Sequence, residues 1–66
     1  MIVFVNGERR EVEPPATIDQ VLGLGGRAPR GFAVAVDGEV VPRARHRTTH
    51  LDEGARVEIV TAVQGG

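Results

Sequence analysis

The strongest constraint on the fold is that the chain contains a single short amphipathic segment, while its other apolar residues lie in strand-like runs. Thr17 followed three residues later by Gln20 is a capping-box pattern, which predicts that a helix begins at about Ile18. Val21 and Leu22 fall on the same helical face as Ile18. Glycines at three of the next four positions limit the helix to about two turns, because interior glycine destabilises a helix. One such helix can cover only one face of a sheet.

Five strand-like runs accompany this helix and are separated by turn residues. Asn6-Gly7 and Asp37-Gly38 predict two tight hairpins, because these residue types tolerate the positive φ that such turns require. Arg43–His50 has no regular period, which predicts a loop or a short irregular connection. The expected strands are Ile2–Val5, Glu8–Glu13, Phe32–Val36, Glu39–Val41 and Arg56–Ala62. The order strand, strand, helix, strand, strand, strand predicts an α+β sheet that is covered on one face.

The alternation of these strands divides their apolar residues between the two faces of the sheet. We expect the helix to cover Val3, Val5, Val34, Val36, Val57 and Ile59. The opposite face then keeps Ile2, Phe4, Ala33, Ala35, Val60 and Ala62. An exposed apolar patch of this kind is more often a partner site than an accident, and coverage by loops or by self-association is the alternative.

Length and composition exclude several classes of function. We expect the 66 residues to form one small domain over residues 1–62, with a flexible tail at 63–66. A domain of this size has no room for a self-contained enzyme cleft, and a chain without cysteine has no thiol nucleophile of its own. The 8 basic residues, all arginine, oppose 9 acidic ones, so there is little attraction to nucleic acid or to an anionic membrane. The longest apolar run, Met1–Val5, is too short to span a bilayer, and a cytoplasmic location is expected.

Internal motifs give weak candidates for chemistry. Gly23–Gly26 lacks the Lys-Ser/Thr of a phosphate-binding P-loop and follows a helix start instead of preceding a helix. His46 and His50, with Asp52 nearby, have a spacing that could bind zinc on a helix, but no helical period supports it, so we expect surface histidines and no metal site. The arginines at 43, 45 and 47 could grip a phosphate or an acidic partner, although a solvated loop is the commoner case. The absence of tyrosine and tryptophan, which would stack bases, disfavours RNA binding.

The last four residues, Val63, Gln64, Gly65 and Gly66, have little to offer a core but end in a carboxylate. Two consecutive glycines can enter a channel that is too narrow for a Cβ atom. The carboxylate is an unreactive anion at neutral pH, so it needs activation before a nucleophile can attack it. The tail is therefore the best candidate for a reactive group, and an ordinary frayed chain end is the alternative.

Several stretches together resemble the ThiS family, the sulfur carriers of thiamine biosynthesis. They are Val5–Glu8, Thr17–Leu22, Phe32–Arg43, Asp52–Gly54 and, most specifically, Val57–Gly66. The resemblance covers essentially the whole chain. It implies a ubiquitin-like β-grasp fold, with a mixed sheet of about five strands and one short helix packed on one face.

The resemblance also implies a reaction at the C-terminus. Gly66 would be adenylylated by a ThiF-type adenylyltransferase that uses ATP and Mg²⁺, and then converted to a thiocarboxylate by a persulfide that a cysteine desulfurase supplies. A ThiG-type thiazole synthase would take the sulfur for the thiazole ring. The chain itself is then a protein co-substrate instead of an enzyme, and we expect it to bind no cofactor, metal, nucleic acid or membrane.

On this interpretation the partner contacts the open face of the sheet and the tail. The predicted contact residues are Ile2, Phe4, Ala35, Val60, Ala62, Val63, Gln64 and Gly65, with Arg43 and Arg45 as rim charges.

Three other functions fit part of the pattern. The small subunit of molybdopterin synthase resembles the chain in fold and in its Gly-Gly end, but the short length and the sequence Val41-Pro42-Arg43 disfavour it. A β-grasp RNA-binding module of the TGS type would share the fold without needing the two terminal glycines. A ubiquitin-like modifier would place Gly66 in amide linkage to lysines of other proteins.

Overall fold

A computed structural model describes residues 1–23 and 31–61 of the chain, and it contains a five-stranded sheet with the strand order β2-β1-β5-β3-β4. One short helix, α1, and one turn of 3-10 helix, η1, accompany the sheet. The elements are β1 (Ile2–Val5), β2 (Glu8–Glu11), α1 (Ile18–Leu22), β3 (Phe32–Val36), β4 (Glu39–Val41), η1 (Arg43–Arg45) and β5 (Arg56–Thr61).

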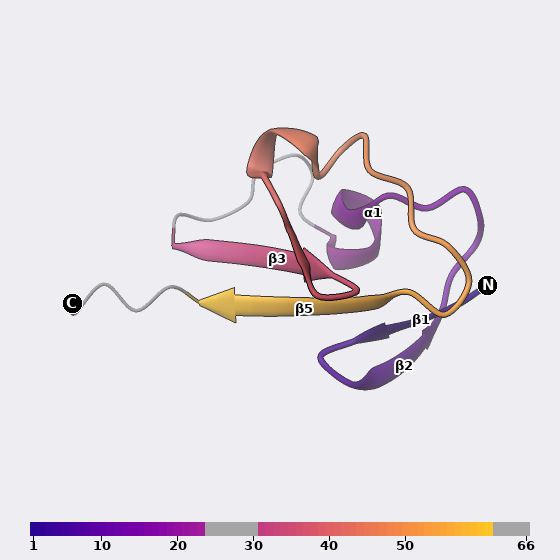
Figure 1. The fold of residues 1–66 in the computed structure, drawn as a ribbon. Helices are drawn as coiled ribbons and strands as arrows, with labels where there is room; N and C mark the ends of the chain where they lie inside the picture. The colour runs from indigo at the N-terminus through magenta and orange to yellow at the C-terminus, as the bar shows by residue number, and fades with distance from the viewer. Residues whose placement is uncertain (24–30, 62–66) are drawn as a thin grey trace.

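The last strand, β5, lies in the middle of the sheet (Figure 1). It pairs in parallel with β1, where Val5 is opposite Val57, and antiparallel with β3, where Val36 is opposite the same residue. The sheet is therefore mixed, and α1 lies against one face of it. This arrangement confirms the predicted α+β class and the ubiquitin-like β-grasp fold.

The helix begins and ends where the sequence predicts. Gln20 donates its backbone N–H to Thr17 Oγ1 at 3.2 Å, and Thr17 donates its own to Gln20 Oε1 at 3.0 Å, which completes the capping box. Gly23 follows with φ 67° as a left-handed C-cap, a conformation that glycine adopts without strain. Among the described residues, no helix is long and apolar enough to cross a membrane.

The core lies between α1 and the covered face of the sheet. Its buried members are Val3, Val5, Ile18, Val34, Leu51, Ala55 and Val57. Val36 and Ile59 pack against this cluster, so the six residues predicted to face the helix all do so. Leu51 and Ala55 add to the core from the connection that precedes β5, which the alternation of the strands does not reveal.

The connection from η1 to β5 is bonded to the α1 region through its backbone. Asp19 donates its N–H to the carbonyl oxygen of His46 at 3.0 Å, and Leu51 donates to that of Ala16 at 2.8 Å. These bonds satisfy backbone groups that would otherwise be buried without partners, so an irregular segment can cross the covered face and contribute to the core.

One predicted boundary is changed by the structure and another is not tested. β2 ends at Glu11 and not at Glu13, although Val12, which packs against the core, still donates its N–H to the carbonyl oxygen of Met1 at 2.8 Å. β5 is described as far as Thr61, and Ala62 lies outside the described residues.

The assignment of the two faces is tested by making the same substitution on each. Val34→Ala, at a residue that is 0% exposed, should lower the free energy of unfolding by about 1–3 kcal/mol, because it removes two methyl groups and leaves a cavity. Val40→Ala, at a neighbouring-strand residue that is 68% exposed, should change it by less than about 0.5 kcal/mol. Urea denaturation followed by circular dichroism measures both values, and equal losses would contradict the assignment.

Candidate functional site

The open face of the sheet is the side that α1 leaves uncovered, and it carries the apolar described residues that the sequence predicts to contact a partner. Ile2 and Phe4 on β1 and Ala35 on β3 are half-buried on this face, and Val60 on β5 is 56% exposed. The intervening Val3 is fully buried in the core. The first strand therefore turns Ile2 and Phe4 away from α1, as its alternation predicts.

An apolar strip runs across three strands of the open face. Ala33 is opposite Val60, and Ala35 is opposite Val40, which is 68% exposed. Val40 is absent from the predicted contact residues, because a strand of three residues has too little alternation to define its faces. The strip includes Val60, which lies one residue before the described end of β5.

Charged side chains separate this strip from Phe4. Arg56 on β5 is opposite Phe4, and Glu58 on the same strand is opposite Ala35. Both charged residues are exposed. The open face is thus apolar on both sides of a charged segment of β5. The alternation of β5 places Glu58 on the same face as Val60, but only the strand pairing shows that Arg56 lies beside Phe4 and Glu58 beside Ala35.

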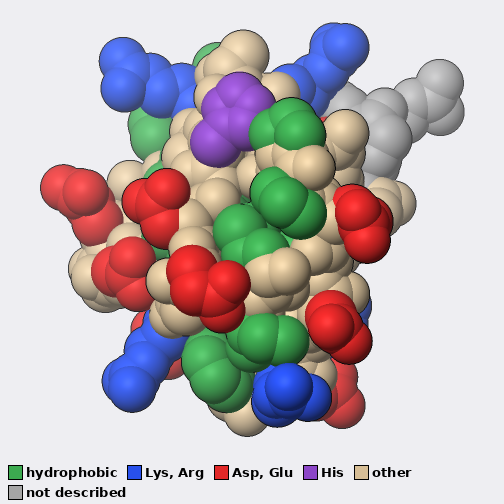
Figure 2. All heavy atoms as spheres, turned by 90° about the vertical axis from the view of Figure 1, so that its right-hand side faces the viewer, with side chains coloured by type: hydrophobic (Ala, Val, Ile, Leu, Met, Phe, Trp, Pro, Cys, Tyr) green, Lys and Arg blue, Asp and Glu red, His purple; other side chains and the backbone are tan. Residues whose placement is uncertain are grey.

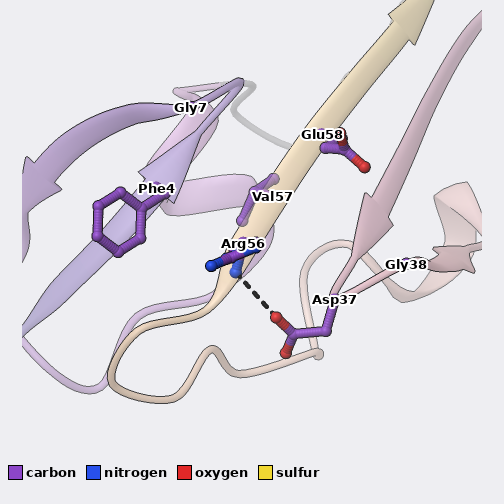
Figure 3. Close-up of a pocket in the computed structure, with 7 residues that line it drawn as sticks. All are labelled: Phe4, Gly7, Asp37, Gly38, Arg56, Val57 and Glu58. Carbon is purple, nitrogen blue, oxygen red and sulfur yellow. Dashed lines mark hydrogen bonds between the residues drawn. The ribbon is translucent and has the colours of Figure 1, made fainter.

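A shallow recess of about 720 Å³ lies over this charged segment (Figure 3). Two hairpin turns form its sides, and the start of β5 forms its floor. Its lining residues are Phe4, Gly7, Asp37, Gly38, Arg56, Val57 and Glu58. The recess presents one cation and two carboxylates beside an aromatic ring, so it can bind a polar partner group, but its lining contains no serine, cysteine or histidine to act as a nucleophile or base.

The predicted reactive terminus follows β5 directly in the sequence. Its residues Ala62, Val63, Gln64, Gly65 and Gly66 lie outside the described part of the chain, so their roles stay predictions. β5 itself is held by β1 on one side and by β3 on the other up to Thr61. The β3 pairing therefore continues to Thr61, whereas the β1 pairing ends at Val57.

Arg43 and Arg45 do not join the open-face residues. They belong to η1, and the residues that follow η1 bond to the α1 region, so both arginines lie on the helix side of the sheet (Figure 1). Both are exposed. Their proposed role as rim charges stays a prediction, and it requires a partner that reaches around the edge of the sheet at β4.

His46 is buried, which corrects the expectation of a surface histidine. Only 2% of it is exposed, and its ring Nε2–H donates to the carbonyl oxygen of Val41 at 3.0 Å. The ring Nδ1 is buried without a hydrogen-bond partner among the described residues. His50 is exposed, and no group of His, Cys, Asp or Glu among the described residues could hold a metal ion. His46 therefore serves the packing of the covered face.

A second recess, of about 490 Å³, lies between the β2–α1 connection and α1. It is lined by Val12, Glu13, Pro14, Pro15, Ala16, Gln20 and Val21. Figure 2 shows this N-terminal end of the molecule, where acidic side chains border a strip of apolar ones. The end is remote from the point where β5 leads into the C-terminus (Figure 1). Glu13 is the only ionisable residue in the lining, so the recess offers no pair of groups for acid–base chemistry.

Comparison with known sequences relates the whole chain to one family. The sequence model of the ThiS family matches residues 3–66. A curated thiazole synthase from Paramagnetospirillum magneticum is 32% identical over 66 residues, which cover 100% of this chain and 20% of the relative. The chain therefore spans about a fifth of the length of this curated relative.

Comparison with solved structures agrees with the fold. The crystal structure of a thiamine biosynthesis protein (ThiS) from Geobacter metallireducens matches with a TM-score of 0.77 and 26% identity, over 100% of both chains. A solution NMR structure of a thiamine biosynthesis protein from the same organism matches with a TM-score of 0.67 and 24% identity, over 100% of this chain and 88% of the other. At this lower identity, the second match supports the fold alone.

The two histidines provide a matched test of the buried site. His46→Ala should lower the free energy of unfolding by about 2–4 kcal/mol, because it removes a buried ring and leaves the Val41 carbonyl without its donor. His50→Ala, at an exposed position, should change it by less than about 0.5 kcal/mol. Thermal denaturation with and without Zn²⁺ measures both effects. Stabilisation of the native chain by stoichiometric Zn²⁺, lost in either variant, would instead show a metal site.

Proposed function

Because this chain belongs to the ThiS family, we propose that it is a sulfur carrier of thiamine biosynthesis and that the carboxylate of Gly66 is the group that carries the sulfur. The observation that carries the proposal is the family match over residues 3–66, which includes the terminal Gly-Gly pair. The chain acts as a protein co-substrate, and its partners supply the catalytic groups.

The chemistry follows from the low reactivity of a carboxylate. The Gly66 carboxylate attacks the α-phosphorus of ATP and displaces pyrophosphate, which gives an acyl-adenylate with a good leaving group. The terminal sulfur of a persulfide then attacks the acyl carbon and releases AMP. A thiol cleaves the resulting acyl disulfide, becomes oxidised to a disulfide and leaves the thiocarboxylate on Gly66. ATP and Mg²⁺ belong to the partner that catalyses the first step.

The shape of the chain suits delivery of its terminus into another protein. The segment from residue 61 to residue 66 reaches at most about 20 Å when extended, which allows the domain to dock outside a buried active site. A glycine next to the terminal residue lets the tail pass a constriction that would exclude a Cβ atom. The open face, with Val60 close to the start of the tail, is the surface best placed to dock.

We assign three partners on this basis. A ThiF-type adenylyltransferase activates Gly66, a desulfurase-derived persulfide supplies the sulfur, and a ThiG-type thiazole synthase accepts it. The thiazole synthase is supported by the curated relative of that name, in which a segment of 66 residues is similar to this entire chain. Sulfur donor and acceptor would then be parts of one polypeptide in that relative.

The decisive test is the intact mass of the chain after incubation with a ThiF-type adenylyltransferase, ATP, Mg²⁺ and a persulfide donor. Replacement of one carboxylate oxygen by sulfur should raise the mass by about 16 Da, with fragmentation placing the change at Gly66 and excluding oxidation of Met1. A control chain that carries one extra alanine after Gly66 should remain folded and unmodified, because its carboxylate is displaced from the reacting position.

Modification of the extended chain at the native rate would contradict a role for the Gly66 carboxylate. Deletion of both terminal glycines separates this proposal from the RNA-binding alternative, since a binding module keeps its affinity without them, whereas a carrier loses all activity.

The docking surface is tested by adding a charge to the apolar strip. Val60→Glu should raise the Kd for the adenylyltransferase by about tenfold or more, because it buries an unpaired carboxylate at the interface. Thr48→Glu, which adds the same charge at an exposed position in the connection bonded to the α1 region, should leave the Kd unchanged. Isothermal titration calorimetry measures both, and equal effects would place the contact elsewhere.

A further inference from the structure

The two hairpin turns beside β5 have the same local structure. Asn6-Gly7 joins β1 to β2, and Asp37-Gly38 joins β3 to β4. Asn6 and Asp37 each have φ 51°, and the glycines that follow have φ 82° and 86°. Positive φ at both central residues is typical of the tight hairpin turn that Asn-Gly and Asp-Gly favour. The turns flank β5 from its two neighbouring strands.

The side chain of the first residue in each turn bonds to the backbone of β5. Asn6 Oδ1 accepts the N–H of Ile59 at 2.8 Å, and Asp37 Oδ1 accepts the N–H of Arg56 at 3.0 Å (Figure 3 shows the second bond). The same two residues also bond through their own N–H groups, Asn6 to the carbonyl oxygen of Val57 and Asp37 to that of Arg56. Each turn therefore makes two contacts with β5.

The two side-chain bonds hold different ends of β5. The parallel pairing of β1 with β5 ends at Val5 and Val57, after which β1 turns away. Asn6 Oδ1 extends that pairing by two further residues of β5, to Ile59. Asp37 holds the other end of the strand, where Phe4 also donates its N–H to the carbonyl oxygen of Ala55.

We infer that Asn6 is a positioning residue: its side-chain oxygen holds the β1 edge of β5 at Ile59 and so sets the direction of the last described residues before the C-terminus. This inference rests on the proposed function. The β3 edge of β5 is paired as far as Thr61, whereas on the β1 edge the bond from Ile59 to Asn6 is the last one among the described residues. Asp37 bonds to Arg56 at the start of the strand, seven residues before Val63, and has no such role.

The shared turn geometry supplies a matched pair of variants. Asn6→Gly and Asp37→Gly each leave a Gly-Gly turn, which tolerates the same positive φ, and each removes one side-chain bond to β5. They release opposite ends of β5, and because Asp37→Gly also removes a carboxylate from the recess, the two variants are compared in hydrogen exchange and not in kinetics. Asn6→Asp keeps both the turn preference and an oxygen that can accept the Ile59 N–H, so it serves as the conservative rescue.

Two measurements on the full chain read out the effect. Amide hydrogen exchange measured by NMR should show that Asn6→Gly raises the exchange rate of the Ile59 amide by about fivefold to tenfold, which is the effect of losing one modest hydrogen bond. Asp37→Gly should raise the exchange rate of the Arg56 amide in the same way. Steady-state adenylylation by a ThiF-type enzyme with ATP should show that Asn6→Gly lowers kcat by about threefold to tenfold at unchanged KM, because docking is intact but the carboxylate is less well placed. Asn6→Asp should restore kcat.

Several outcomes would overturn the inference. An unchanged rate of amide exchange at Ile59 in Asn6→Gly would show that the Asn6 side chain does not hold β5 at Ile59. Faster exchange at Ile59 with native kcat would show that Asn6 has no role in positioning, as would a low kcat in Asn6→Asp when its exchange at Ile59 is native. Failure of the native chain to be adenylylated at all would refute the proposed function instead, and the exchange measurement would still decide whether Asn6 holds the β1 edge of β5.

Discussion

The structure depends on the burial of Val57, near the start of the central strand β5. This residue is opposite Val5 on one side and Val36 on the other, and only 1% of it is exposed. Through these pairs β5 joins β1, its parallel neighbour, to β3, its antiparallel neighbour, so the first and last strands of the chain lie side by side. Parallel neighbours cannot be joined by a tight turn, which is why α1 and the connection before β5 must lie between them in the sequence.

A single short helix cannot by itself cover a five-stranded sheet. The connection that contains His46, Leu51 and Ala55 completes the covered face, and its backbone bonds to the α1 region keep its polar groups satisfied. The helix can be short because its capping box and its glycine C-cap satisfy groups at both ends. An irregular segment thus provides the cover that further turns of helix would provide in a larger domain.

The open face is exposed because α1 and the connection before β5 cover only the other side of the sheet. With one side of the sheet buried, the other keeps Phe4, Val40 and Val60 in contact with solvent beside the charges of Arg56 and Glu58. A mixed surface of this kind is typical of an interface that must form and release, because its apolar area alone does not make a permanent complex.

Much of this protein is determined locally by its sequence. The capping box at Thr17, the helix stop at Gly23, the two hairpin turns and the faces of β1, β3 and β5 all follow from neighbouring residues, and so does the Gly-Gly terminus. The tertiary structure alone decides what depends on contacts distant in sequence. Burial of His46, the charged recess around Arg56 and the bond from Asn6 to Ile59 arise only when β1 pairs with β5, or when the last connection packs on α1. No local pattern encodes such pairings, because they join residues that are brought together by the fold as a whole.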